Sequence, residues 1–315
     1  MARGFARNLL RLTVTLLIVS FLSFLLINLL PGDPALQIVG IQYANEENVA
    51  QVREDLGFNK PIVTRYMDWL GDVVQGDFGT SYRSRQPVRE SIVERLPVTL
   101  ELLILTQLVA IVGALIIAPL AALRPRSWFD RSTTAGVSAG LAAPPFTLAL
   151  GLIFLFAVTW NIFPATGYVH LSESIPENLR SMVLPTFTLA LVPLASYVQV
   201  LRTEIMDTMQ EDYVTLARSR GLSTRYVMMR HVLRPSSLSL ITLIGINTGA
   251  LLGGAVIIET IFSLPGIGRL TVDAINNRDY ILVQGTVLFI TVAFVLVNFA
   301  VDLVYTSLDP RIRRS

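Results

Sequence analysis

The sequence predicts an all-α membrane protein that crosses the bilayer six times, with both termini in the cytoplasm. Hydrophobic residues make up 52% of its 315 residues and charged residues 15%, and the mean hydropathy is +0.58. A soluble domain carries roughly 25% charged residues. The apolar residues gather in long runs, and arginines cluster in alternate polar intervals, as the positive-inside rule predicts for a protein with several spans. We therefore expect a single transmembrane domain over residues 1–315.

The first apolar run, 12–30, follows a short segment that contains Arg3, Arg7 and Arg11. This arrangement is similar to a secretory signal peptide, but the run has the length of a bilayer span, about 20 residues. It also ends in a Pro-Gly-Asp-Pro sequence instead of a cleavage site made of small residues. We interpret it as an uncleaved first helix whose N-terminus is cytoplasmic.

Residues 31–95 form a polar interval with more acidic than basic residues, which we place outside the cytoplasm. An amphipathic helix is predicted from Pro61 onward, because apolar residues recur there every three to four positions. Its Tyr66 and Trp69 suit the lipid headgroup region, where aromatic residues are enriched. Two interpretations of the interval remain open: a loop that packs on the spans, or a platform on which a soluble receptor docks.

Five further apolar runs are long enough to cross a membrane. They occupy residues 97–123, 132–160, 182–201, 238–262 and 281–306. Arginines follow the first and the last of these runs, which places both of those segments in the cytoplasm. Proline removes a helix hydrogen bond, so Pro144 and Pro145 should bend the run 132–160. Pro185 and Pro193 should break the next run in the same way.

The polar interval 202–235 is rich in arginine and is therefore predicted to be cytoplasmic. Its apolar residues recur at helical spacing on both sides of Gly221. Because glycine adopts backbone conformations that other residues resist, we expect two short helices that meet at Gly221 and lie on the membrane. An ordinary basic loop would carry the same charge, so the pattern alone leaves both interpretations open.

The composition excludes several kinds of chemistry. Cysteine is absent and His170 and His231 are the only histidines, so a zinc site of His and Cys ligands cannot form. The single lysine, Lys60, precedes a proline, whereas a phosphate-binding P-loop needs Gly-Lys followed by Ser or Thr. We therefore expect no catalytic residue, no metal site and no bound cofactor in this chain.

Small residues inside the apolar runs indicate close helix packing. Three glycines of the run 238–262 recur every four residues, and such a stripe lets another helix approach closely. The candidates for helix packing or a gate are Gly245, Gly249, Gly253, Gly254, Pro144 and Pro145.

Polar residues inside a membrane usually face the bundle interior or a solute pathway. The candidates for a pathway lining are Asn247, Glu259 and Glu101. The two glutamates lie near the ends of their runs, so each could instead reach the membrane interface. Asn247 lies deepest.

Short motifs occur in a fixed order along nearly the whole chain. They lie at residues 30–34, 76–79, 95–102, 253–256, 259–262, 265–268 and 308–313. In the interval 202–235, Thr215-Leu216-Ala217 precedes Gly221, and Val232-Leu233-Arg234-Pro235 follows it. Together these motifs resemble the first permease subunit of bacterial ABC importers for dipeptides, oligopeptides and nickel. Thr215 stands where that family carries an acid, and Pro235 where it carries an asparagine.

The resemblance implies the type I ABC importer permease fold, in the bacterial inner membrane, and the import of peptides. It implies a second homologous permease, two cytoplasmic ATPase subunits or domains that bind ATP and Mg, and an extracytoplasmic solute-binding protein. Membrane lipid would surround the chain, and no nucleic acid would bind it. The residues expected to couple the permease to the ATPase are Asp212, Tyr213, Thr215, Leu216, Ala217, Arg218, Arg220 and Gly221.

Other functions remain as alternatives. The same architecture could import nickel or another small solute. A secondary transporter driven by an ion gradient would carry inverted repeats and acids at the centre of the membrane, and a membrane enzyme would carry a cluster of catalytic residues. The sequence shows neither feature clearly.

Overall fold

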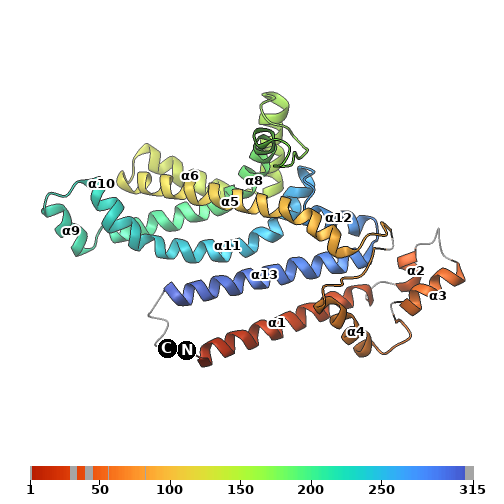
Figure 1. The fold of residues 1–315 in the computed structure, drawn as a ribbon. Helices are drawn as coiled ribbons and strands as arrows, with labels where there is room; N and C mark the ends of the chain where they lie inside the picture. The colour runs from red at the N-terminus through yellow and green to blue at the C-terminus, as the bar shows by residue number, and fades with distance from the viewer. Residues whose placement is uncertain (1, 29–33, 40–44, 56, 82, 309–315) are drawn as a thin grey trace. The chain divides into compact units, whose positions relative to one another are not determined.

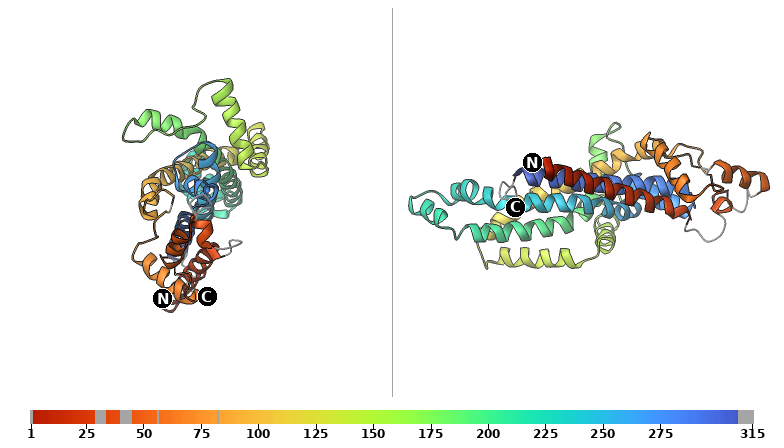
Figure 2. Two further views of the ribbon diagram at one scale, coloured as in Figure 1. Left: turned by 90° about the vertical axis from the view of Figure 1, so that its right-hand side faces the viewer. Right: turned by 90° about the horizontal axis from the view of Figure 1, so that it is seen from below.

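A computed structural model describes residues 2–28, 34–39, 45–55, 57–81 and 83–308. Within these residues the chain is almost entirely helical. Its β-pairing consists of an isolated antiparallel bridge between Thr80 and Pro87. The chain, drawn in Figure 1 and Figure 2, divides into two compact units. One comprises Met1–Thr99 with Pro265–Phe299, and the other Leu100–Leu264 with Ala300–Ser315. Each unit has its own hydrophobic core.

The first unit combines short helices with parts of two long ones. Its elements are α1 (Ala2–Asn28), α2 (Pro34–Val39), α3 (Glu46–Asp55), α4 (Ile62–Val74), the start of α5 (Val88–Leu123), α12 (Ile267–Asn276) and most of α13 (Tyr280–Leu308). Their buried core consists of Ala35, Val52, Val88, Ile92, Ile267, Ala274, Ile281 and Leu282. Two polar contacts join distant segments of this unit. The amide of Ile267 donates to Thr99 Oγ1 at 2.9 Å, and the hydroxyl of Ser81 donates to the buried Asp279 carboxylate.

The second unit packs long helices side by side. It contains α6 (Trp128–Ala142), α7 (Pro145–Leu152), the π-helix η1 (Ile153–Thr159), α8 (Ile175–Thr208), α9 (Asp212–Ser219), α10 (Thr224–Val227), the π-helix η2 (Met228–Val232), α11 (Leu233–Ile261) and the rest of α5 and α13. α8 packs along α11, and the yellow-green α6 runs beside α8 (Figure 2, right). The buried core is formed by Ala110, Ala114, Ala118, Ala122, Tyr197, Val198, Leu201, Ile205, Val214, Ala217, Val227, Met228, Val232 and Leu240. The alanines of α5 recur every four residues, which lets its neighbours approach closely.

Four helices in the described part of the chain are long and apolar enough to cross a membrane: α5, α8, the continuous helix Thr224–Ile261, and Tyr280–Val301 of α13. α6 together with α7 and η1 makes a fifth if this bent pair is one span. In α1, whose side chains are described from Leu10 to Leu25, the apolar stretch within those residues is shorter than these four. The chain is thus a helical multi-pass membrane protein, while six crossings and the location of the two termini stay predictions.

The bend predicted at Pro144 and Pro145 is confirmed. α6 ends at Ala142, the next two residues are extended, and Pro145 starts α7 at an angle of 112° to α6. The first position of a helix needs no N–H donor, so a proline there starts the new helix without losing a hydrogen bond. The predicted run 132–160 therefore contains two helices and a sharp turn.

The breaks predicted at Pro185 and Pro193 are wrong, because both prolines lie inside α8, which is continuous for 34 residues. Each proline removes one N–H donor from the helix. Both prolines are buried, and packing against neighbouring helices stabilises α8 by more than the lost hydrogen bonds. The helix also extends on both sides of the predicted run 182–201, so the start of the interval 202–235 belongs to α8.

Candidate functional site

The two short helices predicted in the interval 202–235 are present as α9 and α10, between α8 and α11. α9 spans eight residues, with Asp212 in its first turn and Arg218 in its last, so both charges complement the helix dipole. One side of α9 is buried. Val214 and Ala217 pack into the core of the second unit, together with Ile205 of α8. α9 is therefore held in a fixed position on the end of α8.

Gly221 makes the turn between α9 and α10, as predicted, with φ at +78°. The amide of Gly221 donates to the carbonyl of Arg218 at 2.9 Å, and the amide of Leu222 donates to the carbonyl of Ala217 at 3.4 Å. This pair of hydrogen bonds is the Schellman motif, which needs a left-handed residue directly after the helix. Glycine adopts that conformation without steric penalty. Ser223 then starts α10, since its Oγ accepts from the amide of Tyr226 at 3.4 Å.

Large apolar side chains are exposed on α9, on the turn that follows it, on α10 and at the start of η2. These are Tyr213, Leu216, Leu222, Tyr226 and Met229. Four arginines around them are exposed as well: Arg218, Arg220, Arg225 and Arg230. Figure 1 shows α9 and α10 at one end of the paired helices α8 and α11. Exposed apolar side chains among charged ones are typical of a surface that binds a partner. A role in coupling stays a prediction, and we call these nine residues the coupling surface after it.

The structure separates the eight predicted coupling residues into two groups. Seven are exposed: Asp212, Tyr213, Thr215, Leu216, Arg218, Arg220 and Gly221. Ala217 is only 7% exposed and packs into the core. Its small side chain therefore positions α9 and does not form part of the coupling surface.

The four candidate glycines of α11 differ in their surroundings. A Cβ atom on Gly245 would lie 2.1 Å from Val301 Cγ1, and one on Gly254 would lie 3.0 Å from Leu189 Cδ1. Gly249 is buried, whereas Gly253 is exposed and its Cβ would meet no atom within 4 Å. Close packing thus favours glycine most strongly at Gly245, while at Gly254 a small shift of the flexible Leu189 side chain would make room. A gating role for these glycines, and for the exposed Pro144 and Pro145, stays a prediction.

The three candidates for a pathway lining lie in different environments. Glu259 is fully buried, and Asn247 donates from Nδ2 to the carbonyl of Leu243 in its own helix at 3.1 Å. Glu101 Oε2 accepts a 2.6 Å hydrogen bond from the hydroxyl of Tyr168. Burial raises the pKa of Tyr168, because the charged phenolate would lose its contact with water. The bond to Glu101 raises it further, because ionisation would place a second negative charge beside the carboxylate. A role in the pathway stays a prediction for all three.

A polar network in the second unit was not among the predicted site residues. The hydroxyl of Tyr197 donates to Gln107 Oε1 at 2.9 Å, and Gln107 Nε2 donates to Thr248 Oγ1 at 2.6 Å. These bonds connect α5, α8 and α11. A glutamine in an apolar run is the signal that sequence provides, but its partners lie 90 and 141 residues away. The network ties together three helices that contribute to the core into which α9 packs.

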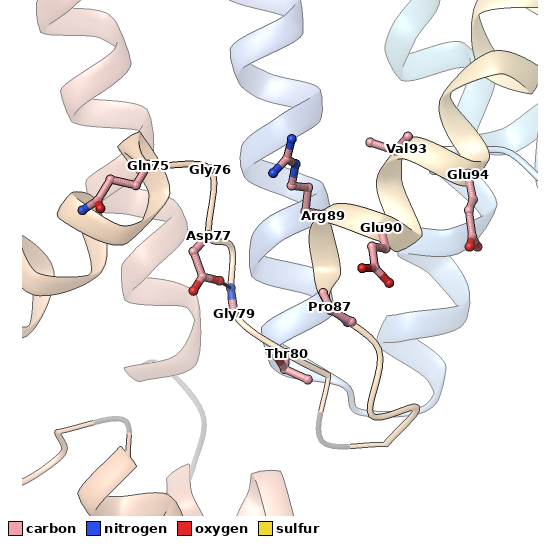
Figure 3. A pocket seen from close by; sticks show the side chains of 10 residues that line it. All are labelled: Gln75, Gly76, Asp77, Gly79, Thr80, Pro87, Arg89, Glu90, Val93 and Glu94. Carbon is pink, nitrogen blue, oxygen red and sulfur yellow. Dashed lines mark hydrogen bonds between the residues drawn. The ribbon is translucent and has the colours of Figure 1, made fainter.

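A cavity of about 690 Å³ opens in the first unit, between the end of α4 and the start of α5 (Figure 3). Its lining consists of Gln75, Gly76, Asp77, Gly79, Thr80, Pro87, Arg89, Glu90, Val93 and Glu94. Asp77 Oδ1 accepts from the amide of Gly79 at 2.8 Å, which fixes the loop on one side of the cavity. In the described part of the chain, no group of His, Cys, Asp or Glu could hold a metal ion. The wall therefore offers charges of both signs and no metal site.

Comparison with known proteins covers almost the whole chain. Residues 110–314 match the model of the binding-protein-dependent transport system inner membrane component, and residues 1–103 match the N-terminal model of such membrane components. A peptide transport system permease protein of Brucella abortus is 42% identical over 298 residues, which are 95% of each chain. A peptide ABC transporter permease protein of Sinorhizobium fredii is 36% identical over 307 residues, 98% of each chain.

The glutathione transport system permease protein of Salmonella typhimurium is also 36% identical over 307 residues, 98% of this chain and 97% of that one. The similarity thus includes both structural units, the coupling surface and the cavity. This chain belongs to the family of binding-protein-dependent transport system inner membrane components.

Proposed function

We propose that this chain is the permease subunit of an ATP-driven peptide importer and forms half of its translocation pathway. Two of the relatives described above are named for peptide transport and one for glutathione transport. These names favour peptides over nickel as the solute. Membership in a binding-protein-dependent family favours an ABC importer over a transporter driven by an ion gradient.

The proposal places the chain in the bacterial inner membrane with six crossings and both termini in the cytoplasm. The crossings are α1, α5, the bent pair of α6 with α7 and η1, α8, α11 and α13. This arrangement puts the arginine-rich segments at residues 3–11, 124–131 and 202–235 on one side, as the positive-inside rule requires. The cavity between α4 and α5 then faces the opposite side, where a solute-binding protein would deliver peptide.

The assembly in this proposal contains a second homologous permease, two cytoplasmic ATPase subunits or domains and an extracytoplasmic solute-binding protein. ATP and Mg bind to the ATPases, and no cofactor binds to this chain. The coupling surface contacts one ATPase. Closure of the ATPase pair moves α9, and the helices rearrange so that the pathway opens to the delivered peptide.

One observation supports this mechanism above all: α9 is exposed on one side and packed into the core of the second unit on the other. That core also includes residues of α5, α8 and α11. A displacement of α9 is therefore transmitted to three helices and is not absorbed by a loose loop. Coupling further requires that the coupling surface binds one arrangement of the ATPases more tightly than the other.

The substitution Leu216→Asp tests the proposal, because Leu216 is 53% exposed and its replacement leaves the core unchanged. We expect the variant to insert into the membrane and to lose co-purification with the ATPase. Uptake of peptide into proteoliposomes that contain ATP should fall at least about tenfold, the effect of a contact worth about 1.4 kcal/mol. Leu216→Met is the matched control, since it keeps an apolar side chain of similar volume. Wild-type uptake by Leu216→Asp would contradict the coupling role.

A further inference from the structure

α4 has one side that packs on α1, in the first unit (Figure 1). The ring centroids of Phe24 of α1 and Tyr66 of α4 are 5.6 Å apart, and those of Phe24 and Trp69 are 5.5 Å apart. Phe21 meets Tyr66 edge to face at 5.1 Å. Tyr66 is almost fully buried. These aromatic contacts fix the position of α4 along α1.

That position lies within the apolar part of α1. The hydroxyl of Tyr66 is 2.7 Å from Ser20 Oγ and donates to the carbonyl of Leu17 at 3.3 Å. The described apolar segment of α1 runs from Leu10 to Leu25, within the apolar run 12–30 of the sequence. With a rise of about 1.5 Å per residue, Ser20 and Leu17 lie roughly 8 Å and 12 Å from Leu25 along the helix. α4 thus packs beside the apolar segment and not beyond its end.

Two flanks of α4 remain outside this contact, and they differ in chemistry. Val63, Met67 and Val74 form a stripe at helical spacing, and each is more than half exposed. The other flank carries Thr64 and the two acids Asp68 and Asp72, all exposed. Asp68 pairs with Lys60 at 2.7 Å on this polar flank. The helix therefore separates an apolar side from a charged side, with α1 between the two.

α1 also presents apolar side chains at the level of its contact with α4. Leu17, Ile18 and Leu22 of α1 are exposed at the same level of the helix as the contact with Tyr66. Apolar side chains at the level of a membrane-crossing segment lie against acyl chains, and a charged flank is compatible with this depth only if it turns toward headgroups. The segregation on α4 meets that requirement.

We propose that α4 is embedded in the bilayer as an interfacial helix, with Val63, Met67 and Val74 against lipid acyl chains and Asp68 and Asp72 toward the headgroups. α4 then lies deeper than the headgroup location expected for Tyr66 and Trp69. It anchors the adjoining loop, which carries the cavity-lining residues 75–77, 79 and 80, to the membrane. The inference depends on membrane insertion of α1 and not on the direction or the substrate of transport.

Site-directed spin labelling tests the depth directly, because the chain contains no cysteine. Single cysteines replace Val63 and Met67 on the apolar flank, and Thr64 and Asp72 on the polar flank, in the full-length permease in lipid bilayers. Collisions of the nitroxide with oxygen and with a water-soluble nickel chelate are then measured. We expect the labels at 63 and 67 to be reached by oxygen and shielded from nickel, at a depth of about 5–10 Å below the headgroup boundary. The labels at 64 and 72 should be reached by nickel.

Two outcomes would overturn the proposal. High nickel accessibility on both flanks would place α4 in water. Exclusion of both reagents at 63 and 67 would show that a protein partner covers this flank. A second measurement needs no change in α4. In a chain with Trp128→Phe and Trp160→Phe, the fluorescence of Trp69 should be quenched by lipids brominated on their acyl chains. Absence of quenching would likewise exclude an embedded α4.

Discussion

Arg202 and Asp130 form a two-pronged ion pair between α8 and the start of α6. Arg202 donates from Nε to Asp130 Oδ1 at 2.6 Å and from Nη2 to Oδ2 at 2.9 Å. Asp130 is only 4% exposed and also accepts from the amide of Arg126 at 2.9 Å. Arg202 lies one turn before Ile205, which packs against α9 in the core. The pair thus fixes α6 to the stretch of α8 that shares a core with α9.

Removal of the carboxylate should destabilise the second unit. In Asp130→Ala the guanidinium of Arg202, which is 24% exposed, keeps its charge and loses both acceptors. A hydrogen bond to a charged group contributes about 2 kcal/mol. We therefore expect a clear fall in the midpoint of thermal unfolding in detergent. The exposed pair of Lys60 and Asp68 provides the control. Lys60→Ala should leave the midpoint nearly unchanged, since exposed ion pairs contribute little.

A variant with the two charges exchanged shows whether the ion pair itself, and not the loss of one side chain, sets the stability. The double variant Asp130→Arg with Arg202→Asp should regain part of the lost midpoint, because it restores opposite charges across the same contact. If Asp130→Ala unfolds at the wild-type temperature, the ion pair contributes nothing to stability.

The burial of Ala217 gives a prediction about transport. Ala217→Arg would place a long charged side chain in the core beside Val214, which has no exposed surface. A buried unpaired charge is strongly unfavourable, so α9 should move away from α8. We expect the protein to insert into the membrane and ATP-dependent peptide uptake in proteoliposomes to be lost. Thr224→Arg adds the same side chain at an exposed position and should keep uptake. Wild-type uptake by Ala217→Arg would show that the packing of α9 is dispensable.

Local features of the chain could be predicted from the sequence where one or two residues determine the backbone. Gly221 permits a left-handed turn, and two consecutive prolines cannot continue a helix, so the turn after α9 and the bend at Pro144 were both predictable. The same reasoning failed at Pro185 and Pro193. A single proline removes only one donor, and the packing around a long buried helix decides whether it continues.

Features that depend on contacts between distant residues were not predictable. Asp130 and Arg202 are 72 residues apart, and nothing in the sequence pairs an acid in a basic loop with that arginine. The hydrogen bonds of Gln107 likewise join residues that are far apart in the sequence, so the sequence does not reveal its partners. The burial of Ala217 on a helix whose neighbours are exposed also depends on how α9 packs against α8. The two short helices and their turn could thus be located from motifs, but the predicted coupling residues could not be divided into exposed and buried ones; their role in coupling stays a prediction.

The conformation of Gly221 predicts a graded response to substitution. Proline has a φ near −65° and no N–H, so Gly221→Pro can adopt neither the φ of +78° nor the hydrogen bond to Arg218. We expect it to abolish ATP-dependent uptake. Asparagine is the side chain that tolerates the left-handed region best, and a Cβ at Gly221 would meet no atom within 4 Å. Gly221→Asn should therefore keep most of the uptake. Equal activity of the two variants would show that the turn does not matter for coupling.

The glycines of α11 allow a test with a matched control in the same helix. A Cβ on Gly245 would lie 2.1 Å from Val301 Cγ1, whereas one on Gly253 would meet nothing within 4 Å. Overpacking of a tight contact costs about 1–3 kcal/mol, and valine has little rotameric freedom with which to move aside. Gly245→Ala should therefore lower the midpoint of thermal unfolding. Gly253→Ala should leave it unchanged or raise it, since alanine stabilises a helix by about 1 kcal/mol relative to glycine.

The pairing of Gly245 with Val301 is tested by a compensating change. Val301→Ala removes the methyl groups that the new Cβ would meet, so Gly245→Ala with Val301→Ala should unfold at a higher temperature than Gly245→Ala alone. Combined with Gly253→Ala, the same Val301→Ala substitution should give an additive effect, because no contact joins the two sites. If Val301→Ala fails to rescue Gly245→Ala, α11 and the end of α13 do not make this contact in the membrane.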